Sequence, residues 1–457
     1  MEHSVYPIQF CERMQRLLGD DYPAFLNAME KERSYGLRVS PLKADPEQFA
    51  ANAPFSLRPI SWAEEGFYYQ AADRPGKHPY YEAGVYYIQE PSAMAVGALA
   101  DAKPGERVLD LCAAPGGKTT HLAGRMHGRG ILIANEIVPS RAKILSQSVE
   151  RAGITNCIVT NESPEKLSSR FPEYFDCIVV DAPCSGEGMF RKEDIAVTEW
   201  TPEAPALCAA RQDEILEEAA KMLRPGGRLI YSTCTFAPEE NEGTLSRFLK
   251  AHPDFSILSV PGDPAFYPGQ PAWYDNAHPD VQHAFRLFPH RLDGEGHFAA
   301  ALCRSGENMQ TELKESALLP SKKIPREFVD FAKDTLQEID FDRLVLNGST
   351  LWHLPEKSPD LSGLRVLRTG LQLGEVKKGR FEPSHALALA LTAEQVQRTL
   401  PLSADDEKTA AYLHGETLPC DHKGWTLVTV DGWPLGWGKA SGGILKNHYP
   451  KGLRRAK

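Results

Sequence analysis

The chain has 457 residues, of which 42% are hydrophobic and 25% charged, and its formal net charge is −10. This composition is typical of a globular protein and excludes a disordered or fibrous chain, while the length predicts about two to four domains. The acidic balance argues against nucleic-acid binding over the whole surface but not on one face, because seven Lys or Arg and only two Asp lie between Asp421 and Lys457. A second basic group comprises Arg365, Arg368, Lys377, Lys378 and Arg380.

The nine cysteines are odd in number and form no C-x-x-C pair. This pattern argues against a disulfide framework and a zinc site, so we expect reduced thiols and no bound metal. The first residues show neither a basic start nor an apolar run, and no stretch reaches the roughly 20 apolar residues of a membrane helix. We therefore expect a cytoplasmic protein that does not engage a membrane.

The first part of the chain, residues 1–103, begins with a helical pattern. Phe10, Met14, Leu17 and Leu18 recur at steps of three and four residues, which places them on one face of a helix. A mixed, proline-rich stretch follows. These features predict a small α+β N-terminal domain.

Residues 104–304 alternate short apolar runs with helical spacing. The apolar runs are 108–111, 131–134, 157–159, 177–180 and 228–231. Helical spacing fills the gaps, as at Ile215, Ala219 and Met222. The alternation predicts an α/β domain with a doubly wound, mostly parallel sheet. Ligands of such sheets bind beyond the carboxyl ends of the strands, so the residues that follow each run are the candidates for a site.

The stretch 305–325 is polar and rich in lysine, and we interpret it as a linker. Beyond it, residues 326–457 mix short apolar runs with glycine turns. Residues 425–430 form one such run, and Asp431-Gly432 follows as a turn signal. This part of the chain is predicted to be a small β-rich C-terminal module.

The stretch V-L-D-L-C-A-A-P-G-G-K-T, residues 108–119, runs from a predicted strand through a glycine turn into a helix. Gly116 and Gly117 allow a ligand to approach the backbone closely. An ATP-binding loop of the form G-x-x-x-x-G-K lacks its first glycine here, and the dinucleotide pattern G-x-G-x-x-G is absent. Glu136 follows the second predicted strand, about 20 residues after the glycines, where nucleoside-binding sheets place a carboxylate on ribose hydroxyls. Together these features favour nucleoside binding over a turn without a ligand.

The run C-A-A-P-G-G-K-T resembles the first motif of the RNA (cytosine-5)-methyltransferases of the Sun/Fmu type, where it holds the methionine part of S-adenosylmethionine. That family has a Rossmann-like methyltransferase fold. The resemblance implies that this cofactor is bound by Cys112, Ala113, Ala114, Pro115, Gly116, Gly117, Lys118, Glu136 and Asp181. The chain departs from the family at one position, because an Asp that usually lies near the adenine falls on Ser163. Asn161 or Glu162 would have to substitute for it.

Two cysteines directly follow predicted strands: D-A-P-C-S-G places Cys184 after the fourth run, and S-T-C-T places Cys234 after the fifth. If these strands are neighbours, both thiols face one pocket. A thiolate that adds to carbon 6 of cytosine puts electron density on carbon 5, which is otherwise a poor nucleophile. A carboxylic acid near ring nitrogen 3 can supply a proton, and Asp181 is the candidate. A single cysteine is usually a small buried hydrophobe, but two at matched strand ends favour chemistry.

The chemistry alone does not rank the two thiols. Enzymes that methylate cytosine in DNA resemble this arrangement and attack with the Pro-Cys position, here Cys184. The stretches D-A-P-C-S-G-E-G-M-F-R-K and Y-S-T-C-T-F-A-P-E-E-N-E resemble the RNA family more closely. That family attacks with the cysteine of the T-C motif and uses the Pro-Cys thiol in product release. The resemblance therefore implies Cys234 as nucleophile and Cys184 as its helper, with Lys118 beside them.

Two further regions carry the resemblance. The stretch 286–298, with His290 and His297, is similar to the last motif of the family's catalytic domain, which implies a role in the target-base pocket; loop packing is the alternative for both histidines. The end of the chain interleaves aromatic residues with cations at Trp433, Trp437, Lys439, Lys446, His448, Tyr449, Lys451, Arg454 and Arg455. This pattern predicts either a surface that stacks on RNA bases or a small β core with a solvated basic tail.

The chain end also resembles the RNA-binding, PUA-like C-terminal extension of the bacterial 16S ribosomal RNA methyltransferases of the family, together with 363–370 and 381–390. The resemblance implies a monomeric enzyme that methylates cytosine in 16S ribosomal RNA or the small ribosomal subunit, with RNA-binding parts at 1–103 and 326–457. The same chemistry on transfer RNA is one alternative. A non-catalytic RNA-binding assembly factor is another, against which the joint retention of Lys118, Asp181, Cys184 and Cys234 argues.

Overall fold

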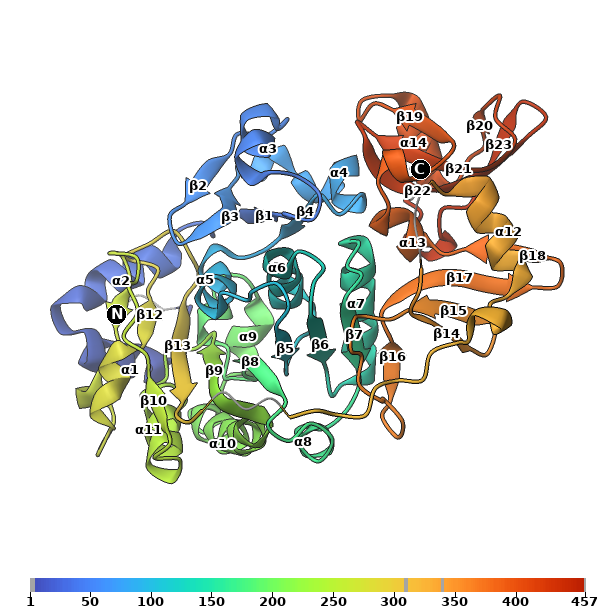
Figure 1. Cartoon of the computed structure of the whole chain (residues 1–457). Coiled ribbons are helices and arrows are strands. Elements are labelled where there is room, and N and C mark those ends of the chain that lie inside the picture. The colour runs from blue at the N-terminus through green and yellow to red at the C-terminus, as the bar shows by residue number, and fades with distance from the viewer. Residues whose placement is uncertain (1–4, 308–310, 338–340, 456–457) are drawn as a thin grey trace.

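The computed structural model describes residues 5–307, 311–337 and 341–455. A central ten-stranded sheet spans the molecule (Figure 1). The chain from 107 to 304 supplies most of it, through β5 (Arg107–Asp110), α6 (Gly117–Met126), β6 (Ile131–Asn135), α7 (Pro139–Arg151), β7 (Cys157–Thr160), α8 (Pro164–Ser168), β8 (Phe175–Asp181), α9 (Asp194–Glu199), α10 (Ala204–Met222), β9 (Leu223–Thr233), α11 (Glu242–Ala251), β10 (Phe255–Ile257), β11 (Tyr267–Pro268), β12 (Phe285–Leu287) and β13 (His297–Arg304).

The strand order of this sheet is β11-β12-β13-β9-β8-β5-β6-β7-β16, and β10 pairs with β13. The five strands β7, β6, β5, β8 and β9 run parallel, whereas β12 and β13 are antiparallel additions at one side. Each of the five predicted apolar runs lies in one of the parallel strands. The predicted doubly wound α/β fold is confirmed, with a parallel centre and antiparallel edges.

Helices cover both faces of the sheet, and alternate side chains of each strand pack against opposite layers. Leu109 and Ile178 pack with α8, α10 and α11, while Leu132 and Val179 pack with α5 (Pro91–Ala100), α6 and α7. Because both faces are buried, the strands read as almost continuous apolar runs in the sequence. Burying each such side chain contributes roughly 1.5–3 kcal/mol to folding.

The first hundred residues lie in two places (Figure 1). The predicted helix is α1 (Ile8–Leu18), which buries Phe10 and Met14. Together with α2 (Tyr22–Glu30) it packs against Phe190, Phe236 and neighbouring rings of the central α/β unit. The following residues form a separate antiparallel sheet of order β2-β3-β1-β4. Its elements are β1 (Gly36–Val39), α3 (Pro46–Asn52), β2 (Arg58–Ile60), β3 (Ala63–Tyr68), α4 (Pro79–Glu82) and β4 (Tyr86–Ile88).

Two small sheets build the C-terminal part. The first has the order β14-β15-β17-β18 and the second β19-β21-β22-β23-β20. One strand of this region, β16 (Val366–Arg368), joins the central sheet. The other elements are α12 (Arg326–Thr335), β14 (Leu344–Asn347), β15 (Thr350–His353), β17 (Leu371–Lys377), β18 (Arg380–Pro383), α13 (His385–Ala390), β19 (Thr399–Leu402), α14 (Glu407–His414), β20 (Leu418–Pro419), β21 (Gly424–Val430), β22 (Trp433–Ser441) and β23 (Ile444–Asn447). The β-rich C-terminal module is therefore confirmed, and the run at 425–430 lies in β21.

Two of the aromatic residues near the chain end belong to a core and not to a base-stacking surface. Trp437 and Tyr449 are buried. The ring of Trp433 lies 4.5 Å from that of Tyr80 in α4, and the N-terminal sheet shares one apolar cluster with the second C-terminal sheet. For Trp437 and Tyr449 the small β core is the correct alternative, whereas His448, Lys439, Lys446 and Lys451 remain exposed. Among the described residues, no helix is both long and apolar enough to span a bilayer.

Candidate active site

The two cysteines predicted to act in the chemistry lie together just beyond the carboxyl ends of two central strands. Cys184 follows β8 and Cys234 follows β9, and these strands are parallel neighbours that pair Asp181 with Ser232. The Sγ atoms of Cys184 and Cys234 lie 3.2 Å apart, and the backbone N–H of Cys234 donates a hydrogen bond to Cys184 Sγ at 3.3 Å. Both thiols are thus placed where ligands of a doubly wound sheet bind.

A buried carboxylate ties the two cysteine loops together. Ser185 and Thr235, which directly follow the cysteines, share a hydrogen bond of 2.8 Å between their hydroxyls. Glu240 accepts from the N–H of Ser185 at 3.0 Å and from its hydroxyl, and also from Gln212 Nε2 at 2.8 Å. Burial raises the pKa of Glu240 to about 7. The sequence reasoning missed this residue, although it lies in the quoted stretch T-F-A-P-E-E-N-E.

A second buried carboxylate, Glu187, connects the same loops to the N-terminal helix. It accepts hydrogen bonds from Phe236 N at 3.1 Å and from Trp200 Nε1 at 3.1 Å, and it forms an ion pair of 2.5 Å with Arg13 of α1. The side chain of Glu187 is fully buried. An unpaired charge at such a position would be costly, so Arg13 holds α1 against the active-site loops. In the sequence, the only indication of this contact is the presence of a glutamate in the stretch P-C-S-G-E-G, residues 183–188.

Asp181 and Lys118 form an ion pair beside the cysteines. Lys118 Nζ lies 2.7 Å from Asp181 Oδ2, Ser232 Oγ donates to Asp181 Oδ1 at 2.7 Å, and His297 Nε2 lies 3.7 Å from the same oxygen. Burial alone would raise the pKa of Asp181, but Lys118 and His297 hold it well below its usual range. Burial alone would lower the pKa of Lys118, but Asp181 and, more weakly, Cys234 raise it. Asp181 is therefore a carboxylate in the resting protein, and Lys118 carries the proton.

The charges around the two thiols differ. The hydrogen bond with Cys234, burial and the charge of Glu240 raise the pKa of Cys184 well above its usual value. Lys118, in contrast, interacts favourably with negative charge on Cys234. A nearby cation stabilises a thiolate and a nearby carboxylate opposes it. These surroundings therefore oppose ionisation of Cys184.

The glycine turn after β5 lies against the ends of the neighbouring elements. Ala113 N donates to Asn135 O at 2.8 Å, Arg141 Nη2 donates to Ala114 O at 2.9 Å, and Ser148 Oγ donates to Pro115 O at 2.7 Å. Gly116 has φ +116°, and a Cβ atom there would lie 2.7 Å from the Cβ of Ser148. Only glycine fits this turn, which brings the backbone close to the edge of the sheet. The turn leads into α6, whose first residues are Gly117 and Lys118.

Glu136 is placed at the end of β6, one strand away from the glycine turn. Its carboxylate is almost completely buried, accepts a hydrogen bond from Val138 N at 2.9 Å and lies 3.3 Å from Arg141 Nη1. A carboxylate offers about four acceptor positions, so two contacts leave capacity for hydroxyl donors. The position is thus compatible with the predicted ribose contact.

Asp110, the last residue of β5, is a buried carboxyl that the sequence reasoning did not select. Thr119 Oγ1 donates to Asp110 Oδ2 at 2.6 Å, whereas Asp110 Oδ1 has no partner among the described residues. Burial raises the pKa of Asp110 to about 7. A buried oxygen without a protein partner, behind the glycine turn, is a position to which a polar ligand group could donate a hydrogen bond.

We expect Asp110→Asn to stabilise the protein at alkaline pH. A carboxyl whose folded-state pKa is raised contributes stability below its unfolded pKa of about 4 and loses it as pH rises to about 7. Without ligand, the variant should therefore melt roughly 5 °C higher than the native chain at pH 8, with a much smaller difference at pH 5. Thermal unfolding measures both, with Asp330→Asn on the surface as control. Equal shifts at the two pH values would contradict the assignment.

The position predicted near the adenine is occupied differently from the family pattern. Ser163 caps α8, where its hydroxyl accepts from Lys166 N at 3.4 Å. Asn161 uses its amide on the carbonyls of Glu136 and Ile137, at 2.7 and 2.9 Å. The Asn161 amide is thus already engaged with the backbone. Of the two proposed substitutes for the usual Asp, Glu162 is the one that has a carboxylate at this end of the sheet.

The residues of the stretch 286–298 differ in position: one lies at the candidate active site, and the others make packing contacts or a buried ion pair. His297 lies beside Asp181, as described above. His290 packs against Phe25 and Phe288, with ring centroids 5.9 and 5.5 Å away, so loop packing describes it best. Arg286 is buried in an ion pair of 2.5 Å with Glu242.

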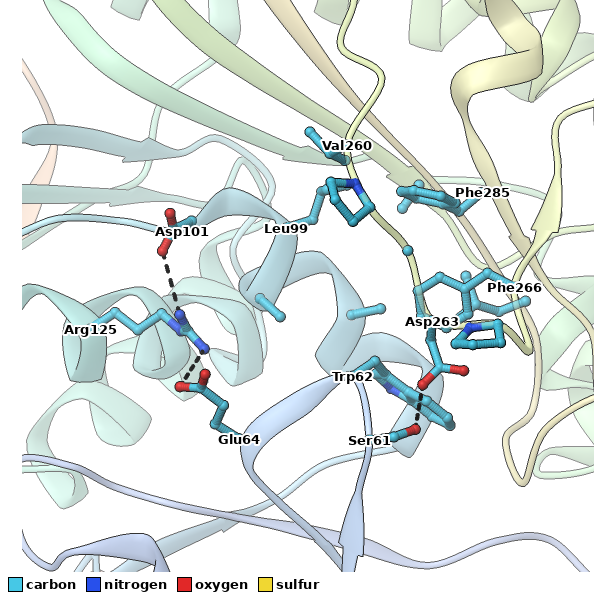
Figure 2. Close-up of a pocket in the computed structure, with 17 residues that line it drawn as sticks. Ser61, Trp62, Glu64, Leu99, Asp101, Arg125, Val260, Asp263, Phe266 and Phe285 are labelled. Carbon is cyan, nitrogen blue, oxygen red and sulfur yellow. Dashed lines mark hydrogen bonds and ion pairs between the residues drawn. The ribbon is translucent and has the colours of Figure 1, made fainter.

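A cavity of about 580 Å³ lies away from the two cysteines. It opens between β3, α5 and the loop between β10 and β11, and its wall is mostly apolar, with Trp62, Phe266 and Phe285 (Figure 2). Arg125, its one cation, is already paired with Glu64 and Asp101. Neither Cys184 nor Cys234 lines this cavity, so it is not the candidate site. No cluster of three or more potential metal ligands occurs among the residues that the structure describes.

Four family models match most of the chain. The family described as 16S rRNA methyltransferase RsmB/F matches residues 98–303. The N-terminal domain of 16S rRNA methyltransferase RsmF matches 6–91, its first C-terminal domain 330–391 and its PUA domain 399–455.

Full-length relatives and solved structures are similar as well. The ribosomal RNA small subunit methyltransferase F of Escherichia coli is 32% identical, and that of Shigella boydii 33%, each over 99% of this chain and 98% of the relative. The crystal structure of a methyltransferase homolog from Pyrococcus horikoshii is 30% identical, with a TM-score of 0.58 over 66% of this chain and 95% of that chain. NSun6 from Pyrococcus horikoshii with SFG shares the fold at 20% identity, with a TM-score of 0.56 over 66% of this chain and 99% of that chain. The chain therefore belongs to the 16S rRNA methyltransferase RsmB/F family, and it carries the N-terminal, first C-terminal and PUA domains of the RsmF type.

Proposed function

We propose that this protein methylates carbon 5 of a cytosine in 16S ribosomal RNA through a transient bond between Cys234 and the base. The observation that supports this most is the pair of thiols 3.2 Å apart, with the Lys118–Asp181 ion pair beside it. Methylation of an RNA nitrogen or hydroxyl uses a lone pair that is already nucleophilic. A thiol nucleophile is needed where the acceptor is a ring carbon that must first be activated.

S-adenosylmethionine is the cofactor we propose, and the residues at the edge of the sheet fit it. The glycine turn at Gly116 permits close approach, Glu136 retains acceptor capacity for a ribose, and Asp110 keeps an unpartnered oxygen behind the turn. Residues 112–118, Glu136 and Asp181 would hold the cofactor. When bound, it supplies the methyl group from a positively charged sulfonium.

Cys234 is assigned as the nucleophile. Its thiolate adds to carbon 6 of the cytosine, a bond forms between Sγ and carbon 6, and the electrons of the double bond between carbons 5 and 6 move towards carbon 5 and nitrogen 3. The charge of Lys118 favours the thiolate of Cys234, whereas Glu240 disfavours ionisation of Cys184. Electrostatics and the motif resemblance thus support the same ranking of the two thiols.

The Lys118–Asp181 pair handles the proton at ring nitrogen 3. The sequence suggested Asp181 as the acid, but Lys118 and His297 keep the pKa of Asp181 low, so this carboxylate has no proton of its own to donate at neutral pH. The proton must therefore come from Lys118, either directly or through Asp181. A donor already placed for the developing charge lowers the barrier without reorganisation.

Cys184 acts later, when the adduct must break. Carbon 5, which by then carries the methyl group, loses its proton to Cys184, and the electrons of that bond restore the double bond. Sγ of Cys234 leaves as a thiolate, and ring nitrogen 3 returns its proton to the Lys118–Asp181 pair. The hydrogen bond with Cys234 is the largest cause of the high pKa of Cys184. Once Cys234 is bonded to carbon, this cause disappears and Cys184 ionises more easily. Its thiolate then becomes available as the base at the stage that needs one.

The substrate is proposed from the family and from the appended domains. The chain carries an RsmF N-terminal domain and a PUA domain in addition to the methyltransferase core. We propose that these parts bind 16S ribosomal RNA or the small subunit, and that the protein works as a monomer in the cytoplasm where that substrate is assembled. Transfer RNA is the alternative substrate.

The purified protein is expected to transfer labelled methyl groups from S-adenosylmethionine to unmodified 16S ribosomal RNA or small subunits and not to transfer RNA. Bisulfite sequencing of the product should reveal a protected cytosine, because methylation at carbon 5 slows deamination. Labelling of transfer RNA would favour the alternative substrate. Labelling without a protected cytosine would refute methylation at carbon 5, and absence of labelling on every RNA would refute the enzymatic role.

A further inference from the structure

A strand from the C-terminal region extends the central sheet at the end that carries the proposed nucleoside contacts (Figure 1). This strand, β16, pairs antiparallel with β7, with Val366 opposite Thr160 and Arg368 opposite Val159. The backbone N–H of Asn161 donates to Arg365 O at 2.9 Å. Residue 365 therefore lies directly beyond the carboxyl end of β7, at the ligand edge of the sheet.

Arg365 holds the carboxylate of Glu162 through two contacts. Its backbone N–H donates to Glu162 Oε1 at 2.6 Å, and its Nη2 donates to Glu162 Oε2 at 3.2 Å. The Glu162 side chain is 8% exposed, whereas that of Arg365 is 64% exposed. A nearly buried carboxylate needs such partners, so the conformation of Glu162 depends on a residue about 200 positions away.

Glu162 is in turn connected to the strand ends that carry the cofactor residues. Asn135, at the end of β6, accepts from Glu162 N at 3.0 Å and donates to Glu162 O at 3.0 Å and to Leu111 O at 3.3 Å. Leu111 directly precedes the glycine turn. One chain of hydrogen bonds thus runs from Arg365 through Glu162 and Asn135 to the start of the predicted cofactor loop.

We infer that Arg365 is a positioning residue for the cofactor: by holding Glu162 it fixes the loop between β7 and α8, so that the C-terminal region sets part of the cofactor affinity. The inference rests on the proposed function. It also accounts for the departure at Ser163. The hydroxyl at that position caps α8, and the remaining carboxylate, Glu162, is held from outside by a segment that follows the linker.

The test compares full-length Arg365→Ala with the native chain, using S-adenosylhomocysteine as the ligand in calorimetry without RNA. We expect the dissociation constant to rise about fivefold. In turnover assays the KM for S-adenosylmethionine should rise by a similar factor while kcat stays within about twofold. Both variants keep the backbone N–H contact with Glu162, but Arg365→Lys also keeps the positive charge and should recover most of the affinity.

Arg380→Ala is the matched control, because Arg380 belongs to the same C-terminal region and pairs at 3.0 Å with a surface carboxylate, Glu382. It should leave the dissociation constant unchanged. Glu162→Gln tests the pair from its other side and should also weaken binding. Unchanged affinity in both the Arg365→Ala and Glu162→Gln variants would overturn this inference alone. A native chain that binds no S-adenosylhomocysteine would overturn the proposed function, and this inference with it.

Discussion

Replacing Cys234 by alanine is expected to reduce methyl transfer at least about 1,000-fold and to abolish the covalent protein–RNA adduct. Without this thiol no bond forms to carbon 6, and carbon 5 stays unreactive. Cys184→Ala should also stop turnover but should let the adduct accumulate, because addition proceeds while elimination fails. Denaturing gels of protein incubated with RNA and S-adenosylmethionine distinguish the two outcomes, since the adduct migrates more slowly than the free chain.

Cys303→Ala provides the matched control for the cysteine variants. Cys303 lies in β13 opposite Arg228, towards the other end of β9 from Cys234, so the same chemical change occurs far from the proposed chemistry. This variant should retain turnover and form no stable adduct. If adduct accumulated in Cys234→Ala and vanished in Cys184→Ala, the roles of the two thiols would be reversed.

Lys118→Met is expected to lower kcat by roughly 100- to 10,000-fold while the protein remains folded. Lys118 is the partner of Asp181 at 2.7 Å and the cation that favours a thiolate on Cys234. Its loss removes both the proton source and this electrostatic support. It also leaves Asp181 without its largest cause of a low pKa, so a protonated Asp181 should supply part of the missing proton and the residual activity should fall less steeply than that of the native chain as pH decreases.

Lys221→Met is the control for this prediction. Lys221 forms an ion pair of 2.8 Å with Glu218 on the surface of α10, and it is half exposed. Its replacement should leave kcat and the pH profile unchanged. Asp181→Asn should lower kcat as Lys118→Met does, because it removes the carboxylate that orients the ammonium. Full turnover in Lys118→Met would exclude the residue from the chemistry.

The site residues that follow strands were accessible from the sequence because their positions depend on local pattern. Cys184 and Cys234 each stand just past an apolar run, and parallel strands end at one edge of a sheet. The contacts that hold the two thiols together were not accessible in this way. Glu240 and Glu187 are ordinary acidic residues in the sequence, and their meaning comes from partners such as Ser185, which lies 55 residues before Glu240.

The sequence by itself determined the α/β core, the glycine turn and the strand-end cysteines, because burial on both faces of a sheet and backbone geometry at a turn leave local signatures. The tertiary structure decided where distant segments meet. It placed α1 against the active-site loops through Arg13, buried Trp437 and Tyr449 in a core where a base-stacking surface was equally possible, and brought β16 to the edge of the central sheet. An aromatic or cationic residue has the same local pattern in a core and on a surface, so only long-range packing distinguishes these roles.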